Sequence, residues 1–280
     1  MRFVGLIAGF AIAAAALAAC GGGDETETPP TSTAPAAGTA QATAVAESPT
    51  IAATLTVEER AEAEALLKAA SLRAEDVPEG LLLEDEGFAT NEELGEVGDL
   101  FVDIFYSAGG VSLKDRFSSS GRILGYHAAY KADVPSEPSS LSGTVSFSVS
   151  VDLYRDEAAL HADSDPSRQH LPDETEVRKN TQELYEALGM ELRDLSVSSL
   201  PFAEVGDERF ALEIRTTVRV PDLDTDLHTV LQWVCIQRDR LFGSLMMTTV
   251  NASPPVEELE ALARTLDQRM KDALEQAPVP

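Results

Sequence analysis

Residues 144–153 read Thr-Val-Ser-Phe-Ser-Val-Ser-Val-Asp-Leu, and this stretch decides the fold class. Its apolar side chains alternate with polar ones at every position, which is the period of a β-strand. Strict alternation is typical of an antiparallel sheet that has one face on a core and the other in water. The stretch therefore predicts an antiparallel strand.

Further strands are predicted on both sides of this stretch. They lie at residues 81–89, 122–131, 191–198, 209–220, 227–238 and 241–250. Residues 227–238 are apolar on both faces near their middle, so this strand should lie inside the sheet rather than at its edge. The tight turn Arg238-Asp239-Arg240 makes the last two strands antiparallel neighbours.

Helical spacing of apolar residues predicts helices before, between and after the strands. The first begins at Thr56, because Thr56 and Glu59 have the spacing of a capping box. Others are predicted from Thr90, at residues 156–161 and 174–188, and as a long C-terminal helix after Ser253-Pro254-Pro255. Residues 97–106 also fit helical spacing, although their Val, Phe and Ile content suits a strand as well.

These elements indicate an α+β fold for residues 56–280. The strands come in runs with short turns and the helices come in clusters, whereas a parallel sheet would need alternating strands and helices. We expect a single globular domain in which one antiparallel β-sheet is flanked by helices, with the long C-terminal helix packed on it.

The N-terminus carries a sorting signal. Arg2 precedes an apolar run at residues 3–16, which is too short for a comfortable membrane span but suits a signal peptide. The run ends at Leu17-Ala18-Ala19-Cys20, which resembles the lipobox of bacterial lipoproteins. That resemblance implies cleavage after residue 19 and a covalent diacylglycerol on the Cys20 thiol. Residues 1–19 are therefore expected to be a lipoprotein signal peptide.

Residues 20–55 follow as a tether. Residues 21–50 contain no aromatic residue, Lys or Arg and are rich in Gly, Ala, Thr, Ser and Pro. Such a segment cannot bury enough apolar surface to offset its chain entropy, so it is expected to be disordered. A flexible chain of this length spans on the order of 30 Å. We therefore expect an extracytoplasmic protein held at a bacterial membrane by an N-terminal lipid.

The charge of the chain limits its partners. It holds 48 acidic and 21 basic side chains, for a net charge of −27, and only four of the acids lie in residues 1–55. Nucleic acid is not an expected partner, because binding phosphates requires clustered Lys and Arg. Adsorption to anionic lipid through a basic patch is disfavoured for the same reason. Contact with the membrane is thus expected through the lipid anchor.

Four short motifs in the folded region resemble those of uncharacterised bacterial envelope lipoproteins. They are Val77-Pro78-Glu79-Gly80-Leu81, Ser120-Gly121-Arg122-Ile123-Leu124-Gly125-Tyr126, Leu153-Tyr154-Arg155 and Val205-Gly206-Asp207-Glu208. The order of the predicted elements is also similar to the PsbP-like α+β fold over residues 75–275. PsbP-like domains generally act by binding, so the resemblance implies a non-enzyme and transfers no active site.

The sequence contains no recognisable catalytic motif, since G-x-S-x-G, H-E-x-x-H, C-x-x-C, P-loop and G-x-G-x-x-G patterns are absent from it. We therefore favour a non-enzymatic binding or accessory module for an envelope protein or a small ligand, and enzymatic activity stays undecided. The alternative is an envelope hydrolase with a His/Asp site around His127 or His161, because a histidine beside a carboxylate can act as a general base.

A calcium-stabilised structural domain is a further alternative. Asp222, Asp224 and Asp226 stand at every second position, as at the start of an EF-hand loop, and calcium prefers such oxygen ligands. However, Leu227 replaces the expected glycine and Trp233 replaces the bidentate glutamate. The simpler interpretation of these acids is a solvated turn between two strands, and no other cofactor is expected.

Candidates for a ligand pocket are Tyr126, His127, Tyr130 and Trp233, which lie at strand positions. Aromatic residues at such positions also serve as core residues, so both interpretations stay open. Cys235 lies in an apolar stretch beside Trp233, which predicts a buried thiol that packs as a small hydrophobic side chain.

Overall fold

The structure is a computed structural model, and it describes residues 55–96, 120–133, 142–168, 171, 173–221 and 224–276. For residues 94–96 and 164–168 it describes the backbone but not the side chains. The predicted signal peptide, the lipobox, all of the tether except its last residue and the predicted helix at residues 97–106 lie outside the described residues.

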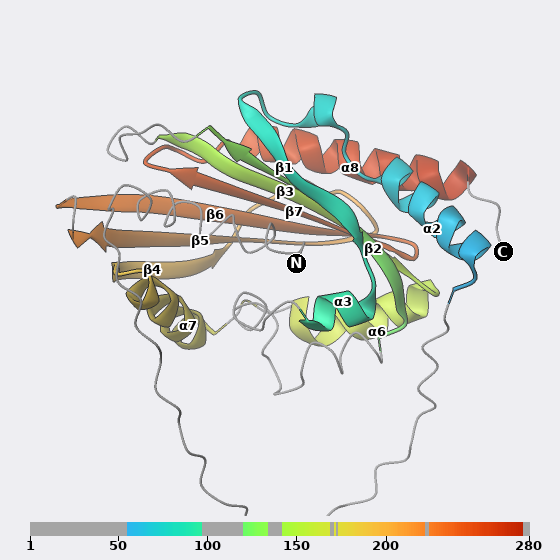
Figure 1. Cartoon of the computed structure of the whole chain (residues 1–280), viewed down its shortest axis with the longest axis horizontal. Coiled ribbons are helices and arrows are strands. Elements are labelled where there is room, and N and C mark those ends of the chain that lie inside the picture. Colours follow the sequence, from blue (N-terminus) through green and yellow to red (C-terminus); the bar gives the residue numbers. More distant parts are fainter. Residues whose placement is uncertain are drawn as a thin grey trace, which may run out of the picture.

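Seven strands of the described chain form one antiparallel sheet, as the alternation in residues 144–153 predicted. Its order is β1-β2-β3-β7-β6-β5-β4, so β7 lies at the centre between β3 and β6 (Figure 1). The interior position predicted for β6 is confirmed. The bounds are β1 (Leu81–Ala89), β2 (Arg122–Ala132), β3 (Gly143–Tyr154), β4 (Glu191–Ser199), β5 (Glu208–Val220), β6 (Thr225–Arg238) and β7 (Leu241–Val250).

The predicted strand at residues 144–153 is β3, and its apolar face is buried. Phe147, Val149 and Val151 are 1% exposed or less, whereas a β-bulge between Thr144 and Ser146 moves Val145 to the opposite side of the sheet. The polar face is not open to water as the alternation predicted, because its side chains are half-buried or buried. Helix α6 (Glu157–Arg168) contacts β3 and packs on this side of the sheet.

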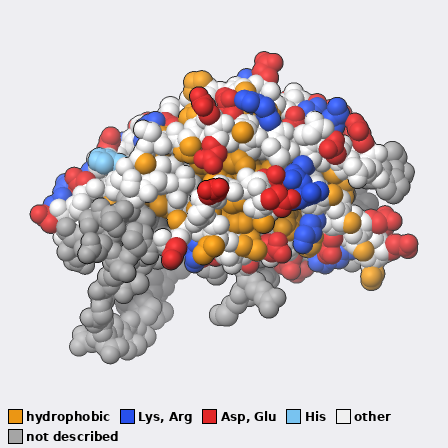
Figure 2. Space-filling view, turned by 90° about the horizontal axis from the view of Figure 1, so that it is seen from above, with side chains coloured by type: hydrophobic (Ala, Val, Ile, Leu, Met, Phe, Trp, Pro, Cys, Tyr) orange, Lys and Arg blue, Asp and Glu red, His pale blue; other side chains and the backbone are white. Residues whose placement is uncertain are grey.

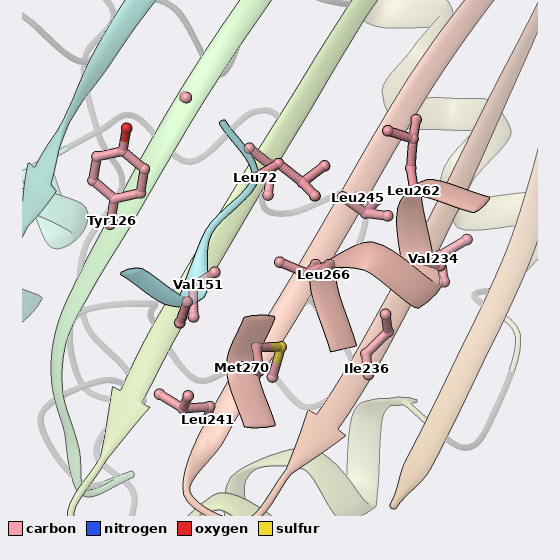
Figure 3. Close-up of a cluster of buried hydrophobic side chains, with 14 of the residues drawn as sticks. Leu72, Tyr126, Val151, Val234, Ile236, Leu241, Leu245, Leu262, Leu266 and Met270 are labelled. Atoms are coloured by element: carbon pink, nitrogen blue, oxygen red, sulfur yellow. The ribbon is translucent and has the colours of Figure 1, made fainter. Parts of the chain in front are cut away.

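Helices α2 and α8 cover the other face. Helix α2 (Val57–Ala70) begins with the predicted capping box between Thr56 and Glu59, and it is followed by the short 3-10 helix η1 (Ala74–Asp76). Helix α8 (Val256–Gln276) is the predicted long C-terminal helix, and it lies beside α2 on the same side of the sheet (Figure 1). In Figure 3 the apolar stripe of α8, with Leu262, Leu266 and Met270, lies over the sheet residues of this core.

A second hydrophobic cluster fills the opposite face, beneath α6 and α7 (Glu174–Ala187). Tyr185 of α7, Trp233 and Cys235 of β6 and Phe242 of β7 are buried there. Helix α3 (Asn91–Glu96) begins one residue after Thr90, where the sequence predicted a helix start. None of the helices that the structure describes combines the length and the apolar composition that a membrane crossing requires. The described residues thus form an antiparallel sheet between two layers of helices, an α+β arrangement.

Candidate functional site

An apolar groove opens between α2, one end of the sheet and the last turns of α8. Its volume is about 450 Å³, which lies within the range of small-ligand pockets, roughly 300–1,000 Å³. It is lined by Leu55, Glu59, Glu62, Ala63, Ala65, Leu66, Ala69, Ile123, Leu153, Arg240, Ala273 and Gln276. Figure 2 views the molecule from the side on which α2 and α8 lie and shows hydrophobic side chains gathered near the middle of this face, with charged side chains around them.

The sheet end of the groove is built by a β-bulge in β2 and by the turn between β6 and β7. A register shift between Arg122 and Leu124 leaves Ile123 as the extra residue of a β-bulge, and bulges redirect side chains in this way. The turn between β6 and β7 brings Arg240 beside the end of β3, where the backbone N–H of Tyr154 donates a 2.9 Å hydrogen bond to the carbonyl of Arg240. Asp239, which precedes it, has a φ of 51°, the left-handed conformation of a tight turn.

The helical walls of the groove are shallow because they consist largely of alanine. Ala65 and Ala69 are exposed on α2, and Ala273 lies on α8 one turn before the end of that helix. A methyl side chain covers little of the backbone below it, so space stays open between the two helices and the sheet. Leu55, the first described residue, also lines the groove. The groove therefore adjoins the point where the predicted tether joins the folded region.

Charged side chains at the groove come from α2 and from the turn between β6 and β7. The backbone N–H and the hydroxyl of Thr56 each donate a 2.7 Å hydrogen bond to the Glu59 carboxylate, and these bonds lower the pKa of Glu59. Glu62 lies one turn further along α2. Among the Lys and Arg side chains that the structure describes, only Arg209, Arg240 and Lys271 form no ion pair. Within the described residues, Arg240 is thus an uncompensated cation at an apolar groove.

The predicted pocket residues Tyr126 and Tyr130 are buried in the core beneath α2 and α8. The hydroxyl of Tyr126 donates a 2.9 Å hydrogen bond to the Glu86 carboxylate. Burial, followed by the Glu86 contacts, raises the pKa of Tyr126 far above its ordinary value, and burial likewise raises the pKa of Tyr130. Both phenols are therefore neutral at physiological pH and pack as core residues.

The other two predicted pocket residues, His127 and Trp233, lie on the opposite face of the sheet. His127 is buried, with its Nε2 3.3 Å from Oδ2 of Asp85 on the neighbouring strand. The indole N–H of Trp233 donates a 2.6 Å hydrogen bond to the Ser244 hydroxyl. Strands β3 and β7 separate β2 from β6, so these two side chains do not form one pocket. None of the four candidates is among the described residues that line the groove.

The acidic turn that suggested calcium is described in part, because Asp222 lies outside the described residues. The carboxylates of Asp224 and Asp226 both contact the Arg219 guanidinium, with 3.3 Å between Asp226 Oδ1 and Arg219 Nη1. Arg219 therefore supplies positive charge where a cation would bind. Across the part of the chain with described side chains, no group of three or more His, Cys, Asp or Glu residues is arranged to hold a metal ion.

The remaining sequence candidates fall into two groups. Cys20 lies outside the described residues. Cys235 is buried as predicted, at 2% exposure. His161 lies on α6, partly exposed, with Nε2 3.4 Å from Glu157 and Nδ1 3.6 Å from Glu208. His127 and His161, the two histidines considered for a hydrolase site, thus each have a carboxylate within 4 Å.

Sequence reasoning missed the groove. Its sequence signals were weak but present: alanine recurs on one side of α2, and Arg240 follows a tight turn. Joining them requires knowing that the turn between β6 and β7 lies beside the first helix, which is a long-range relationship. The class that emerges is an α+β sheet protein with a helix-walled groove at the end of its sheet.

No family model and no curated protein sequence matches this chain. Among solved structures, the chain is similar to the extracellular domain of PknH from Mycobacterium tuberculosis, with a TM-score of 0.41 and 6% sequence identity. The similarity covers 75% of this chain and 96% of that domain.

Proposed function

We propose that this chain is a bacterial lipoprotein, anchored outside the cytoplasm by an acylated Cys20, whose folded region acts as a non-enzymatic binding module. Its ligand is a small molecule or an extended segment of an envelope partner. The lipobox and the tether support the proposed location, and the resemblance to PsbP-like domains supports the proposed binding role.

The groove is the observation that carries the binding function. It has the volume of a small-ligand site, an apolar lining and a few polar groups at its border, which is the usual composition of such sites. The groove is lined by Leu55, the last residue of the proposed tether, which supports a ligand that is met near the membrane surface. The alanine walls leave the groove open without any rearrangement of the core.

Membrane anchoring is tested by expressing the full chain and a Cys20→Ser variant in a bacterial host with a labelled fatty acid. The wild-type protein should incorporate the label and sediment with membranes, whereas the variant should do neither. Label in the variant would show that the lipid is attached at another residue. An unlabelled wild-type protein in the soluble fraction would contradict the proposed lipid anchor.

Binding is tested with a dye whose fluorescence rises in apolar surroundings. Ala65→Trp should fill the groove and reduce the signal, whereas Ala61→Trp, an exposed position on the same helix outside the lining, should leave it unchanged. Equal signals from both variants would show that the dye binds elsewhere. In that case the groove loses its assigned role.

The second candidate function is an envelope hydrolase, and the His127–Asp85 pair favours it. Ser150 is the cross-strand partner of His127, which places their Cβ atoms about 4.5–5.5 Å apart. A histidine that contacts a carboxylate can activate a neighbouring hydroxyl as a nucleophile. Turnover of short-chain nitrophenyl esters that is lost in His127→Gln but kept in His161→Gln would support hydrolysis. Equal rates of ester turnover in the two variants would contradict a hydrolase site at His127.

A further inference from the structure

We infer that the groove binds an amphiphile with one aliphatic chain and an anionic head group, and that Arg240 contacts the head group. This inference rests on the proposed binding function and names the ligand class for the same groove. It follows from three features of the described groove: an apolar interior, a cation without an ion pair and two carboxylates on a different wall.

The interior favours an aliphatic chain. Its apolar lining consists of alanine, leucine and isoleucine side chains, with Leu66, Ile123 and Leu153 among the larger ones. An apolar chain gains free energy when these side chains remove it from water. The described lining offers few hydrogen-bonding groups in this region, so a sugar or a nucleotide would leave polar atoms without partners there.

Arg240 favours an anionic head group. Its guanidinium forms no ion pair with a described residue, although acidic residues outnumber basic ones by more than two to one in this chain. Arginine binds carboxylates and phosphates through two parallel N–H donors, which makes it a specific partner for such a head group. The turn that carries Arg240 is held to β3 by the Tyr154–Arg240 backbone hydrogen bond, so the cation has a defined place.

The acidic wall of α2 decides which end of the groove takes the head group. Glu59 and Glu62 both lie on α2, and Glu59 is already bound by Thr56. An anion near this wall would be repelled, so the head group lies at the sheet end, beside Arg240. A second copy of the chain is disfavoured as the occupant, because two copies that each carry a net charge of −27 repel one another.

Fatty acids and anionic phospholipids share this chemistry, so the probes must separate them. The mature chain from position 20, with Cys20→Ser to leave it unacylated, is titrated with laurate, dodecanol and dodecyltrimethylammonium, which differ only in the head group. Vesicles of phosphatidylglycerol and of phosphatidylcholine form a second arm. Binding of monomeric laurate alone indicates a free fatty acid, and additional binding to phosphatidylglycerol vesicles indicates a lipid head group.

Two matched pairs of variants test the contacts. Arg240→Gln should weaken laurate binding about tenfold, the scale of one charge-assisted contact, whereas Lys271→Gln, which removes a cation outside the groove that likewise has no ion pair among the described residues, should not. Ala65→Trp should abolish binding of all three probes and Ala61→Trp should not. Circular dichroism confirms that each variant is folded.

The outcomes separate the inference from the function on which it rests. Equal affinity for laurate and dodecanol, or equal effects of Arg240→Gln and Lys271→Gln, would overturn the anionic head group while leaving the groove as a binding site. Tighter binding of dodecyltrimethylammonium would assign the site to cations at Glu62. Absence of binding to every probe, or a dimer in sedimentation that Ala65→Trp dissociates, would overturn both the inference and the small-ligand function.

Discussion

Asp76 and Arg269 form a mostly buried ion pair although 193 positions separate them in the sequence. The Nη2 atom of Arg269 on α8 lies 2.6 Å from Oδ2 of Asp76 in η1, and both side chains are less than 20% exposed. Asp76 also accepts a 2.8 Å hydrogen bond from the backbone N–H of Arg73. The pair fixes the segment after α2 to the C-terminal half of α8.

Replacing Asp76 should therefore destabilise the protein. Asp76→Ala leaves the Arg269 guanidinium partly buried without its partner, which should lower the free energy of unfolding by about 2 kcal/mol. Urea denaturation measures the change. The exposed pair Arg73–Glu75 provides the control, because Glu75→Ala should cost less than about 0.5 kcal/mol. Similar losses in the two variants would mean that burial does not strengthen the Asp76–Arg269 pair.

Alanine substitutions at Gly206 and Gly189 compare the cost of steric crowding with the cost of backbone strain alone. Both have φ near 70°, but a Cβ on Gly206 would lie 2.5 Å from Ile236 Cγ2 and 2.6 Å from the carbonyl oxygen of Gln237, whereas a Cβ on Gly189 would contact nothing within 4 Å. Gly189→Ala should cost about 1 kcal/mol of stability from the left-handed conformation alone. Gly206→Ala should cost a further 1–3 kcal/mol, roughly, from the clash. Thermal or urea unfolding of the two variants gives the difference, and equal costs would contradict the crowding at Gly206.

The helix cap at Glu59 should make stability depend on pH in the acid range. Hydrogen bonds from the backbone and the hydroxyl of Thr56 lower the pKa of Glu59 below its ordinary value of 4.5. The contribution of this carboxylate is therefore fully present above pH 4.5 and is lost as the pH falls through its lower folded-state pKa. Asp173 behaves alike, because the backbone N–H of Thr175 lowers its pKa below 3.8.

Urea unfolding at a series of pH values measures this dependence. Glu59→Gln should flatten the acid limb of the stability curve relative to the wild-type protein. Glu58→Gln, which removes a neighbouring carboxylate outside the cap, should leave that limb steep. Acid limbs that stay parallel in all three proteins would show that the cap does not contribute.

Calcium should leave the melting temperature unchanged. The Arg219 guanidinium already contacts Asp224 and Asp226, so a divalent cation would have to displace it and would gain little. Calorimetric melting in the presence of calcium and in the presence of a chelator tests this expectation. A rise of the midpoint with calcium in the wild-type protein would instead establish the calcium-stabilised alternative.

Elements that depend on local sequence pattern were predictable. The alternation in β3, the capping box before α2 and the apolar stripe of α8 are short-range signals, and the structure confirms the strand, the cap and the helix that they predicted. The strand period also places Tyr126 and His127 on opposite faces, because neighbouring residues of a strand point in opposite directions. That rule by itself separates His127 from the two tyrosines of β2 and excludes a pocket that all three would share.

Long-range features were not predictable. The turn after β6 predicted that β6 and β7 pair, but the pairing of β7 with β3 spans most of the folded region and no local pattern encodes it. The bulge at Ile123 depends on how β2 and β3 pair, and the groove depends on that bulge, on α2 and on the turn at Arg240 together. The half-buried and buried polar side chains of β3 likewise reflect the helix that packs on their side of the sheet rather than their own sequence.

Because β7 lies at the centre of the sheet, the two halves of the sheet can join only late in the synthesis of the chain. On the ribosome β1, β2 and β3 emerge first and β4, β5 and β6 follow, yet the two groups have no direct strand pairing with one another in the described sheet. Only when residues 241–250 have been synthesised can the two halves be joined into one sheet. Until then the nascent chain can form only two separate meanders, in which the edge strands β3 and β6 still lack their common partner. The last strand therefore acts as the closing step of folding, and a ribosome that stalls before it would leave a chain prone to aggregation.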